Sequence, residues 1–199
     1  MDAISFFNIW CETINDPTTK FSSRLLRWQD YWYNSSGKTG LMESEIYHEI
    51  ARRINHKCSV QYYYLDAVFY DPEKDLTPNI PDNTTTLRKI RIAVEHENNF
   101  NYNLYQELSH LLLINCDLKV IISYPNNYPC VDVLEQLGKV IMREPRIEID
   151  DNSILLIFGV RGEKDDVYWE GYTFKESTWF SIKYNNVLDR FPIGTLVDS

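Results

Sequence analysis

The sequence predicts a single α/β domain, in which a mixed β-sheet is flanked by helices. Stretches with the apolar patterns of strands are separated by stretches with the 3.6-residue periodicity of helices. Two of the expected strands are joined by one helix, and this βαβ spacing requires parallel pairing. The chain has 199 residues, of which 44% are hydrophobic, so it can bury a core of its own.

The elements of the expected core follow in the order helix, two strands, helix, strand, helix and strand. Their expected ranges are 41–54, 61–71, 88–98, 102–114, 117–125, 131–143 and 153–160. The helices carry apolar residues at i, i+3 and i+4 spacing, and the last two strands are near-continuous apolar runs, as in strands buried on both faces. The polar, proline-containing residues from Pro72 to Thr86 predict a loop between the first two strands.

We expect one domain over residues 1–199, in three parts. Residues 1–36 form an N-terminal helical segment, residues 41–160 the core, and residues 161–199 a C-terminal β extension. The Asn, Ser and Gly residues between Tyr33 and Gly40 indicate a joint before the core. The aromatic, partly alternating C-terminal residues are typical of a strand pair at the edge of the sheet, and ordinary core packing is their expected role.

Cysteine usage and hydropathy indicate a cytoplasmic protein. The four cysteines lack Cys-x-x-Cys spacing, which favours reduced thiols over a disulfide framework or a zinc site. No apolar stretch approaches the roughly 20 residues that span a bilayer, so no membrane partner is expected. The first ten residues also lack the features of a signal peptide.

The strand over residues 88–98 carries two acids on one face. Its apolar residues share the other face: Ile90, Ile92 and Val94. Glu95 and Glu97 therefore stand side by side, about 7 Å apart along the strand. Like charges on one face repel, so folding stability gives no reason for this pair. A hard cation such as Mg²⁺, or alternatively Mn²⁺, would remove the repulsion, because it binds carboxylate and phosphate oxygens.

A third acid, Asp66, lies in the middle of the preceding strand, where an acid is poorly suited. Asp71 precedes Pro72 and is instead the expected start of the turn that ends this strand. The pattern is thus a strand with Asp66, a loop, and a strand that ends in Glu95-x-Glu97.

This pattern resembles the PD-(D/E)xK nuclease superfamily, and more closely its restriction-endonuclease-like members in which glutamate replaces the motif lysine. Asp66 matches the first acid of the motif, Glu95 the second, and Glu97 stands where lysine is usual. Asn98 extends the similarity to a Glu-His-Glu-Asn string. The resemblance covers residues 41–160 and implies a restriction-endonuclease-like core that hydrolyses DNA. The motif lysine normally orients or polarises the attacking water, so Glu97 must act through metal or water, or the site is inactive.

The resemblance also implies roles for the acids. Asp66, Glu95 and Glu97 would bind Mg²⁺ or Mn²⁺ and act in catalysis. Family members often carry a further acid on the helix before the first strand. Glu49 is our first choice for it and Glu45 the second, since both lie on a common helix face. Both acids also suit a solvated helix surface, and this alternative stays open.

The net charge of −9 argues against a broad nucleic-acid-binding surface, because phosphates are bound by Lys and Arg. Lys89 and Arg91 share the strand face of the glutamates, where they are expected to contact nucleic acid or to neutralise the acids. Lys119 on the next strand either replaces the motif lysine or snorkels to solvent. Further basic candidates are Arg24, Arg27, Arg52, Arg53 and Lys57, of which the last three also suit a helix C-terminus.

Two histidines lie near the motif. His96 falls on the apolar strand face and is expected in the core, and His110 is expected on a helix surface. We expect DNA as the partner, and a homodimer is compatible with the sequence. Two alternatives stay open: an inactive nuclease-like module that binds nucleic acid or a protein partner, and an acidic interaction protein of the immunity or inhibitor type. The first predicts no metal binding, and the second predicts metal-independent binding of a basic partner.

Overall fold

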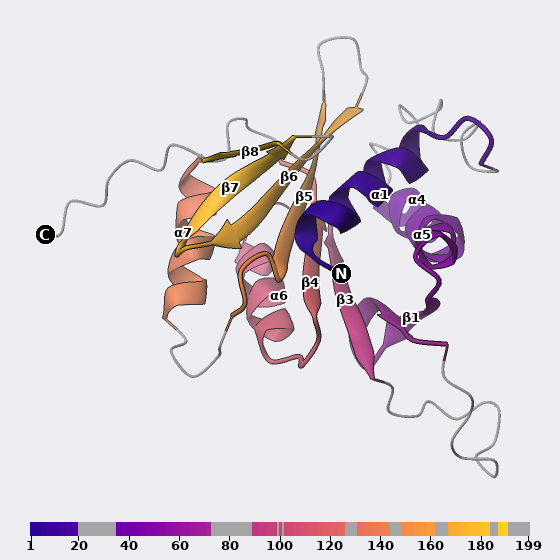
Figure 1. Ribbon diagram of the computed structural model, residues 1–199, viewed down its shortest axis with the longest axis horizontal. Coiled ribbons are helices and arrows are strands. Elements are labelled where there is room, and N and C mark those ends of the chain that lie inside the picture. The colour runs from indigo at the N-terminus through magenta and orange to yellow at the C-terminus, as the bar shows by residue number, and fades with distance from the viewer. Residues whose placement is uncertain are drawn as a thin grey trace, which may run out of the picture.

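The computed structural model describes residues 1–19, 35–72, 89–98, 100, 102–125, 131–143, 149–161, 167–183 and 187–190. Within these ranges the chain forms an eight-stranded mixed sheet whose strands follow in sequence order from β1 to β8 (Figure 1). The strands are β1 (Lys57–Tyr62), β2 (Leu65–Tyr70), β3 (Ile90–Glu97), β4 (Leu118–Ser123), β5 (Ile154–Arg161), β6 (Val167–Lys175), β7 (Thr178–Lys183) and β8 (Val187–Arg190).

The sheet combines two antiparallel meanders with a parallel centre. β1, β2 and β3 pair antiparallel, β3, β4 and β5 pair parallel, and β5 to β8 again pair antiparallel. The parallel strands are joined through helices α6 (Tyr102–Leu112) and α7 (Val131–Met142). The predicted α/β class, the parallel pairing across the first of these helices and the C-terminal strand pair are confirmed.

Helices cover both faces of the sheet and bury one core on each. One face packs against α1 (Ala3–Asn15), α4 (Ser35–Leu41), the π-helix η1 (Met42–Ile46) and α5 (Tyr47–Arg53). The other face packs against α6 and α7 (Figure 1). Alternation along β3 distributes its residues between the two cores, with Ile92 and Val94 in the first and Ala93 in the second.

Helix α1 is part of the main core. Asp2 caps it by accepting a hydrogen bond from the Ser5 amide at 2.9 Å. The apolar face behind this cap is fully buried, and Trp10 packs edge-on against Trp169 of β6 with ring centroids 5.0 Å apart. The residues from Ser35 to Gly40, expected as part of a joint, are helical and belong to α4, so that prediction was wrong. Tyr33, Arg24 and Arg27 lie outside the described residues.

The expected strand over residues 61–71 is in fact part of a β-hairpin. β1 ends at Tyr62, β2 begins at Leu65, and these two residues are paired across a two-residue turn at Tyr63 and Tyr64. Aromatic residues favour strands, so the pattern gave no sign of this turn. β2 ends at Tyr70, which confirms Asp71 as the residue that leaves the strand. Nearly all of the loop expected from Pro72 to Thr86 lies outside the described residues.

The described cysteines, Cys11, Cys58 and Cys116, are free thiols. Burial raises the pKa of Cys11 and of Cys58 to about 12, so both are unreactive neutral groups near pH 7. Cys130 lies outside the described residues. Within the described part of the chain, no helix is long and apolar enough to cross a membrane.

Candidate carboxylate site

Asp66 and Glu95 face each other across the β2–β3 ladder. The ladder pairs Ala67 with Val94, and the next step of the same register sets Asp66 opposite Glu95. Side chains of directly opposed residues share one face of the sheet, with Cβ atoms roughly 5 Å apart. Asp66 also accepts a hydrogen bond from the backbone amide of His96 at 2.7 Å. The structure thus brings the two predicted acids together at the carboxyl end of β3.

The Glu95 carboxyl group is buried, with 3% of the residue exposed. Burial, and next the charge of Asp66, raises the pKa of Glu95 to about 9. The pKa of Asp66 is also raised, chiefly by burial, although its hydrogen bonds to the His96 amide and to Glu95 oppose that rise. The pair therefore holds one proton near neutral pH, donated from Glu95 to the Asp66 carboxylate.

One oxygen of this pair lacks a partner. Glu95 Oε1 is buried and makes no hydrogen bond to any described residue. An unpaired buried acceptor costs about 1–3 kcal/mol, so such atoms in native proteins commonly face an ion, a ligand or water. This orphaned oxygen is the observation that makes the pair a candidate site.

Three further carboxylates surround the pair at longer range. The charges of Glu43 and Glu97 raise the pKa of Asp66, and that of Glu107 raises the pKa of Glu95. Glu97 follows Glu95 on the same face of β3, Glu107 comes from α6, and Glu43 comes from η1. The pKa of Glu107 is itself raised, chiefly by burial, and the charge of His110 opposes that rise. The acids therefore gather from both helical layers at one end of β3.

Polar contacts tie the surrounding elements to this end of the sheet. Gln61 of β1 donates to the Glu43 carboxylate at 2.5 Å, and the Asn98 amide donates to Thr39 of α4 at 3.0 Å. The hydroxyl of Ser123 on β4 donates to the backbone carbonyl of Glu97 at 2.8 Å. These bonds hold η1 against β1, and α4 and β4 against the end of β3.

A buried hydroxyl also lies near the acids. Tyr47 of α5 is 1% exposed, and its Oη makes no hydrogen bond to any described residue. Burial, and next the charge of Asp66, raises the pKa of Tyr47 well above its ordinary value. Asp66 and Tyr47 therefore interact electrostatically across the end of β2, and the hydroxyl remains a neutral donor.

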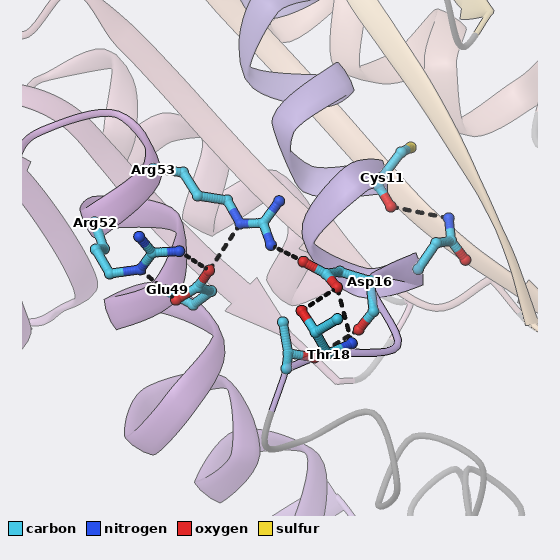
Figure 2. A network of polar contacts seen from close by, with 8 residues as sticks. Cys11, Asp16, Thr18, Glu49, Arg52 and Arg53 are labelled. Carbon is cyan, nitrogen blue, oxygen red and sulfur yellow. Dashed lines mark hydrogen bonds and ion pairs between the residues drawn. The ribbon is translucent and has the colours of Figure 1, made fainter.

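Glu49 lies in a different network, as Figure 2 shows. Its carboxylate accepts two hydrogen bonds from Arg52, at 2.8 and 2.7 Å, and one from Arg53 at 2.8 Å. Arg53 also bonds to Asp16, at the end of α1. The hydrogen bonds to Arg52 are the main cause that lowers the pKa of Glu49. Glu49 therefore pairs within α5, where it holds Arg53, the residue that bonds α5 to Asp16 at the end of α1. The helix acid whose charge acts on Asp66 is Glu43.

The second choice for the helix acid, Glu45, lies on η1 and is half-buried. The helix predicted over residues 41–54 is divided into a π-helical turn and α5, and this turn shifts which side chains face the sheet. Regular 3.6-residue spacing predicts Glu49 as the helix acid, whereas the charge that acts on Asp66 is that of Glu43.

The predicted nucleic-acid-binding residues lie away from the acids. Arg91 pairs with Asp117 at 3.2 Å and with Asp71 at 3.6 Å, about 13 Å along β3 from Glu95. Lys89 is exposed, one residue before β3 begins. Lys119 is buried in β4 opposite Ala93, two residues before the level of Glu95. Arg91 therefore neutralises two aspartates at the other end of the strand, and not the glutamates.

The two histidines lie where the sequence predicts. His96 is buried, and its Nε2 shares a hydrogen bond with the Tyr124 hydroxyl at 2.9 Å. His110 is exposed on α6 and lies 3.5 Å from Glu107 across one helical turn. The sequence did not identify Glu107 as a candidate site residue. The pattern of an amphipathic helix does not reveal which strand the helix packs against, so it cannot place a helix acid near Glu95.

The arrangement suits a hard cation held by few protein ligands. Among the described residues, no three acidic, histidine or cysteine side chains are gathered as closely as a preformed metal centre requires. Asp66 and Glu95 supply a two-carboxylate core, and Mg²⁺ usually takes one or two carboxylates and completes its shell with waters or substrate phosphates.

A scan of protein-family models and searches of the curated proteins and of the solved structures give no match to this chain.

Proposed function

We propose that this protein is a metal-dependent nuclease that hydrolyses DNA phosphodiester bonds at the Asp66–Glu95 pair. The observation that carries the proposal is the buried, unpartnered Oε1 of Glu95 beside a second carboxylate. Two acids that share one proton form a cation site when that proton leaves. Mg²⁺ or Mn²⁺ bound there would lower the pKa of a water ligand and offset charge on the phosphate.

The arrangement of strands supports a restriction-endonuclease-like core. The family motif sets an Asp on one strand and the second acid on the next, and here Asp66 and Glu95 lie on neighbouring antiparallel strands. A helix then leads from β3 to the parallel strand β4. These features are what the resemblance requires between residues 41 and 160.

Each acid then has a role set by its place. Asp66 and Glu95 supply the inner oxygens of the site. Glu97, which is half-buried on the same face, supplies a further ligand or positions the attacking water. Glu43 and Glu107 act at longer range, through water, on the charge of the site. In this assignment Glu43 takes the helix position first given to Glu49.

A cleavage assay tests the proposal. Purified protein is incubated with supercoiled plasmid and with single-stranded DNA in Mg²⁺, Mn²⁺ or chelator, and the wild type is compared with Glu95→Gln and Asp66→Asn. Glu135→Gln is the matched control, because Glu135 pairs with Lys139 on α7. We expect metal-dependent cleavage by the wild type and the control, and a loss of 10²-fold or more in the two site variants, a magnitude on the scale of other electrostatic site residues. Cleavage that survives Glu95→Gln would falsify the assignment.

The second candidate function is a catalytically inactive nuclease-like module. Two observations favour it: glutamate stands at the motif lysine position, and Arg91 pairs with Asp71 and Asp117 at the other end of β3. Such a module keeps its fold but does not bind metal. Calorimetric titration of wild type and Asp66→Asn with Mn²⁺ separates the two candidates, since only a nuclease shows heat that depends on Asp66.

A further inference from the structure

The tip of the β1–β2 hairpin presents an unsupported aromatic ring. Tyr64 is 99% exposed and Tyr63 is 56% exposed, whereas the preceding Tyr62 is buried. The Tyr63 ring packs edge-on against Tyr62, with centroids 4.9 Å apart. Tyr64 therefore extends beyond a hairpin whose base is well packed.

The backbone of this tip is costly for tyrosine. Both turn residues have positive φ, 47° at Tyr63 and 69° at Tyr64, as a type I′ turn requires. Asn and Gly adopt this conformation readily, while bulky residues are disfavoured there. Burial does not compensate at Tyr64, because its ring packs in no core. An exposed aromatic residue in a strained conformation is a reason to look for a ligand contact.

The same tip lies beside the carboxylate site. Tyr64 is two residues from Asp66, in the turn just before β2 begins, and antiparallel pairing sets the start of β2 beside the end of β3. Gln61, at the other side of the tip, bonds to Glu43. The hairpin thus places the exposed ring at the end of the sheet where β2 begins and where β3 ends in its acids.

The charge of the chain makes a stacking contact useful. The net charge is −9, and among the described residues Arg52, Arg53 and Arg91 are already paired with carboxylates. A chain of this net charge therefore gains less from phosphate neutralisation than a basic chain does. A base stacked on an aromatic ring contributes about 1–3 kcal/mol without any phosphate contact. Bases within a duplex are stacked on their neighbours and do not offer a free face to Tyr64.

We propose that Tyr64 stacks on an unpaired nucleobase next to the scissile phosphate, so that the substrate is single-stranded or locally unpaired nucleic acid. This inference rests on the proposed function for the position of the phosphate. Tyr64 is then the residue that determines substrate class, while Asp66 and Glu95 carry the chemistry.

Binding and cleavage by four proteins test the inference: wild type, Tyr64→Asn, Tyr64→Phe and Tyr168→Asn. Tyr168 is the matched control, a 41% exposed tyrosine on β6. Binding is followed by the anisotropy of a fluorescent phosphorothioate oligothymidylate in Mg²⁺, and by that of a duplex of equal length. Thermal unfolding is recorded for each protein, because Asn suits the turn better than Tyr.

We expect Tyr64→Asn to bind the single strand about ten-fold more weakly while its melting temperature is unchanged or raised. Tyr64→Phe keeps the ring and should bind like the wild type, as should Tyr168→Asn. Equal single-strand binding by wild type and Tyr64→Asn overturns the inference, and so does a wild type that binds no single strand. Loss of self-association in Tyr64→Asn, with no change in oligonucleotide binding, assigns the ring to a protein contact and also overturns it.

The two proposals fail in different ways. If the wild type cleaves nothing but binds single strands through Tyr64, the nuclease proposal fails and the stacking inference stands. If Tyr64→Asn cleaves and binds single strands as the wild type does, the stacking inference fails and the nuclease proposal stands.

Discussion

Asp66 on β2 and Glu95 on β3 lie opposite each other on neighbouring strands and share a hydrogen bond between their carboxyl groups. A buried acid and a half-buried acid so close cannot both ionise cheaply, and one of them keeps a proton at neutral pH. Glu95 holds that proton, and its second oxygen has no hydrogen-bond partner among the described residues. The pair is thus destabilising without a cation, and this property can be measured without an activity assay.

Glu95→Gln should stabilise the metal-free protein at alkaline pH. The folded-state pKa of Glu95 is raised from 4.5 to about 9, so its favourable contribution is complete below pH 4.5 and is lost progressively as pH rises from there to about 9. The variant has no such loss, and we expect its stability relative to the wild type to rise by up to about 1.4 kcal/mol per pH unit between pH 5 and pH 8. Urea denaturation in chelator at both pH values measures the difference.

Glu135→Gln is the control for this experiment. Its carboxylate pairs with Lys139 on the surface of α7 at 2.7 Å, and the loss of such a pair changes stability by only about 0.5 kcal/mol. If Glu95→Gln shows the same small effect at pH 5 and pH 8, the buried proton is not on Glu95.

Tyr47→Phe should also stabilise the metal-free protein. The variant removes a buried hydroxyl that has no hydrogen-bond partner among the described residues, and we expect a gain of about 1 kcal/mol. Tyr124→Phe is the comparison variant, because it removes a buried hydroxyl that shares a hydrogen bond with His96 at 2.9 Å. That variant should lose about 1 kcal/mol. Thermal unfolding of both proteins gives the comparison, and a destabilised Tyr47→Phe would contradict the burial of an unpaired hydroxyl.

Gly171→Ala should lower the stability of the protein, because the added methyl group disturbs the packing of α1 on the sheet. A Cβ at Gly171 would lie 2.8 Å from the ring of Phe7, which is 1% exposed and cannot turn away. Overpacking of this kind costs about 1–3 kcal/mol. Gly40→Ala is the control, because its Cβ meets nothing within 4 Å and helix α4 favours alanine. Chemical denaturation should show a loss in the first variant and a small gain in the second.

Asp16→Asn should lower the melting temperature of the protein at neutral pH but not in strong acid. Hydrogen bonds from Thr18, and next from Arg53, lower the pKa of Asp16 to about 2. Its contribution is therefore present above the ordinary range of aspartate and is lost as pH falls towards 2. We expect the variant to melt below the wild type at pH 7, with a difference that narrows from about pH 4 downwards. An equal difference at pH 7 and pH 2 would show that charge is not involved.

Local patterns in the sequence were sufficient to predict most of the elements. Periodicity placed α6, α7, β3, β4 and β5 within a few residues of their observed bounds, because each buries a continuous apolar face. The same alternation predicted His96 in the core and the two glutamates of β3 on the opposite face. The two-residue turn at Tyr63 and Tyr64 escaped prediction, since its residues are typical of strands.

The candidate site was predictable only in part. Asp66 and Glu95 stood out as acids within apolar strands, and the antiparallel register of β2 and β3 then set them opposite each other. Glu43 and Glu107 did not stand out, because their place depends on a π-helical turn and on how α6 crosses the sheet. Arg91 is a similar case, since its partners Asp71 and Asp117 come from segments that only the fold brings together.

The sequence by itself determined the class of fold, the order of its elements and the pair of acids at its centre, because these follow from local periodicity and from residue types that are unfavourable in a strand. Only the tertiary structure decided which helix acids act on that pair and which basic residues are already neutralised. Those facts depend on packing between elements distant in the chain, and no local pattern encodes the register of that packing.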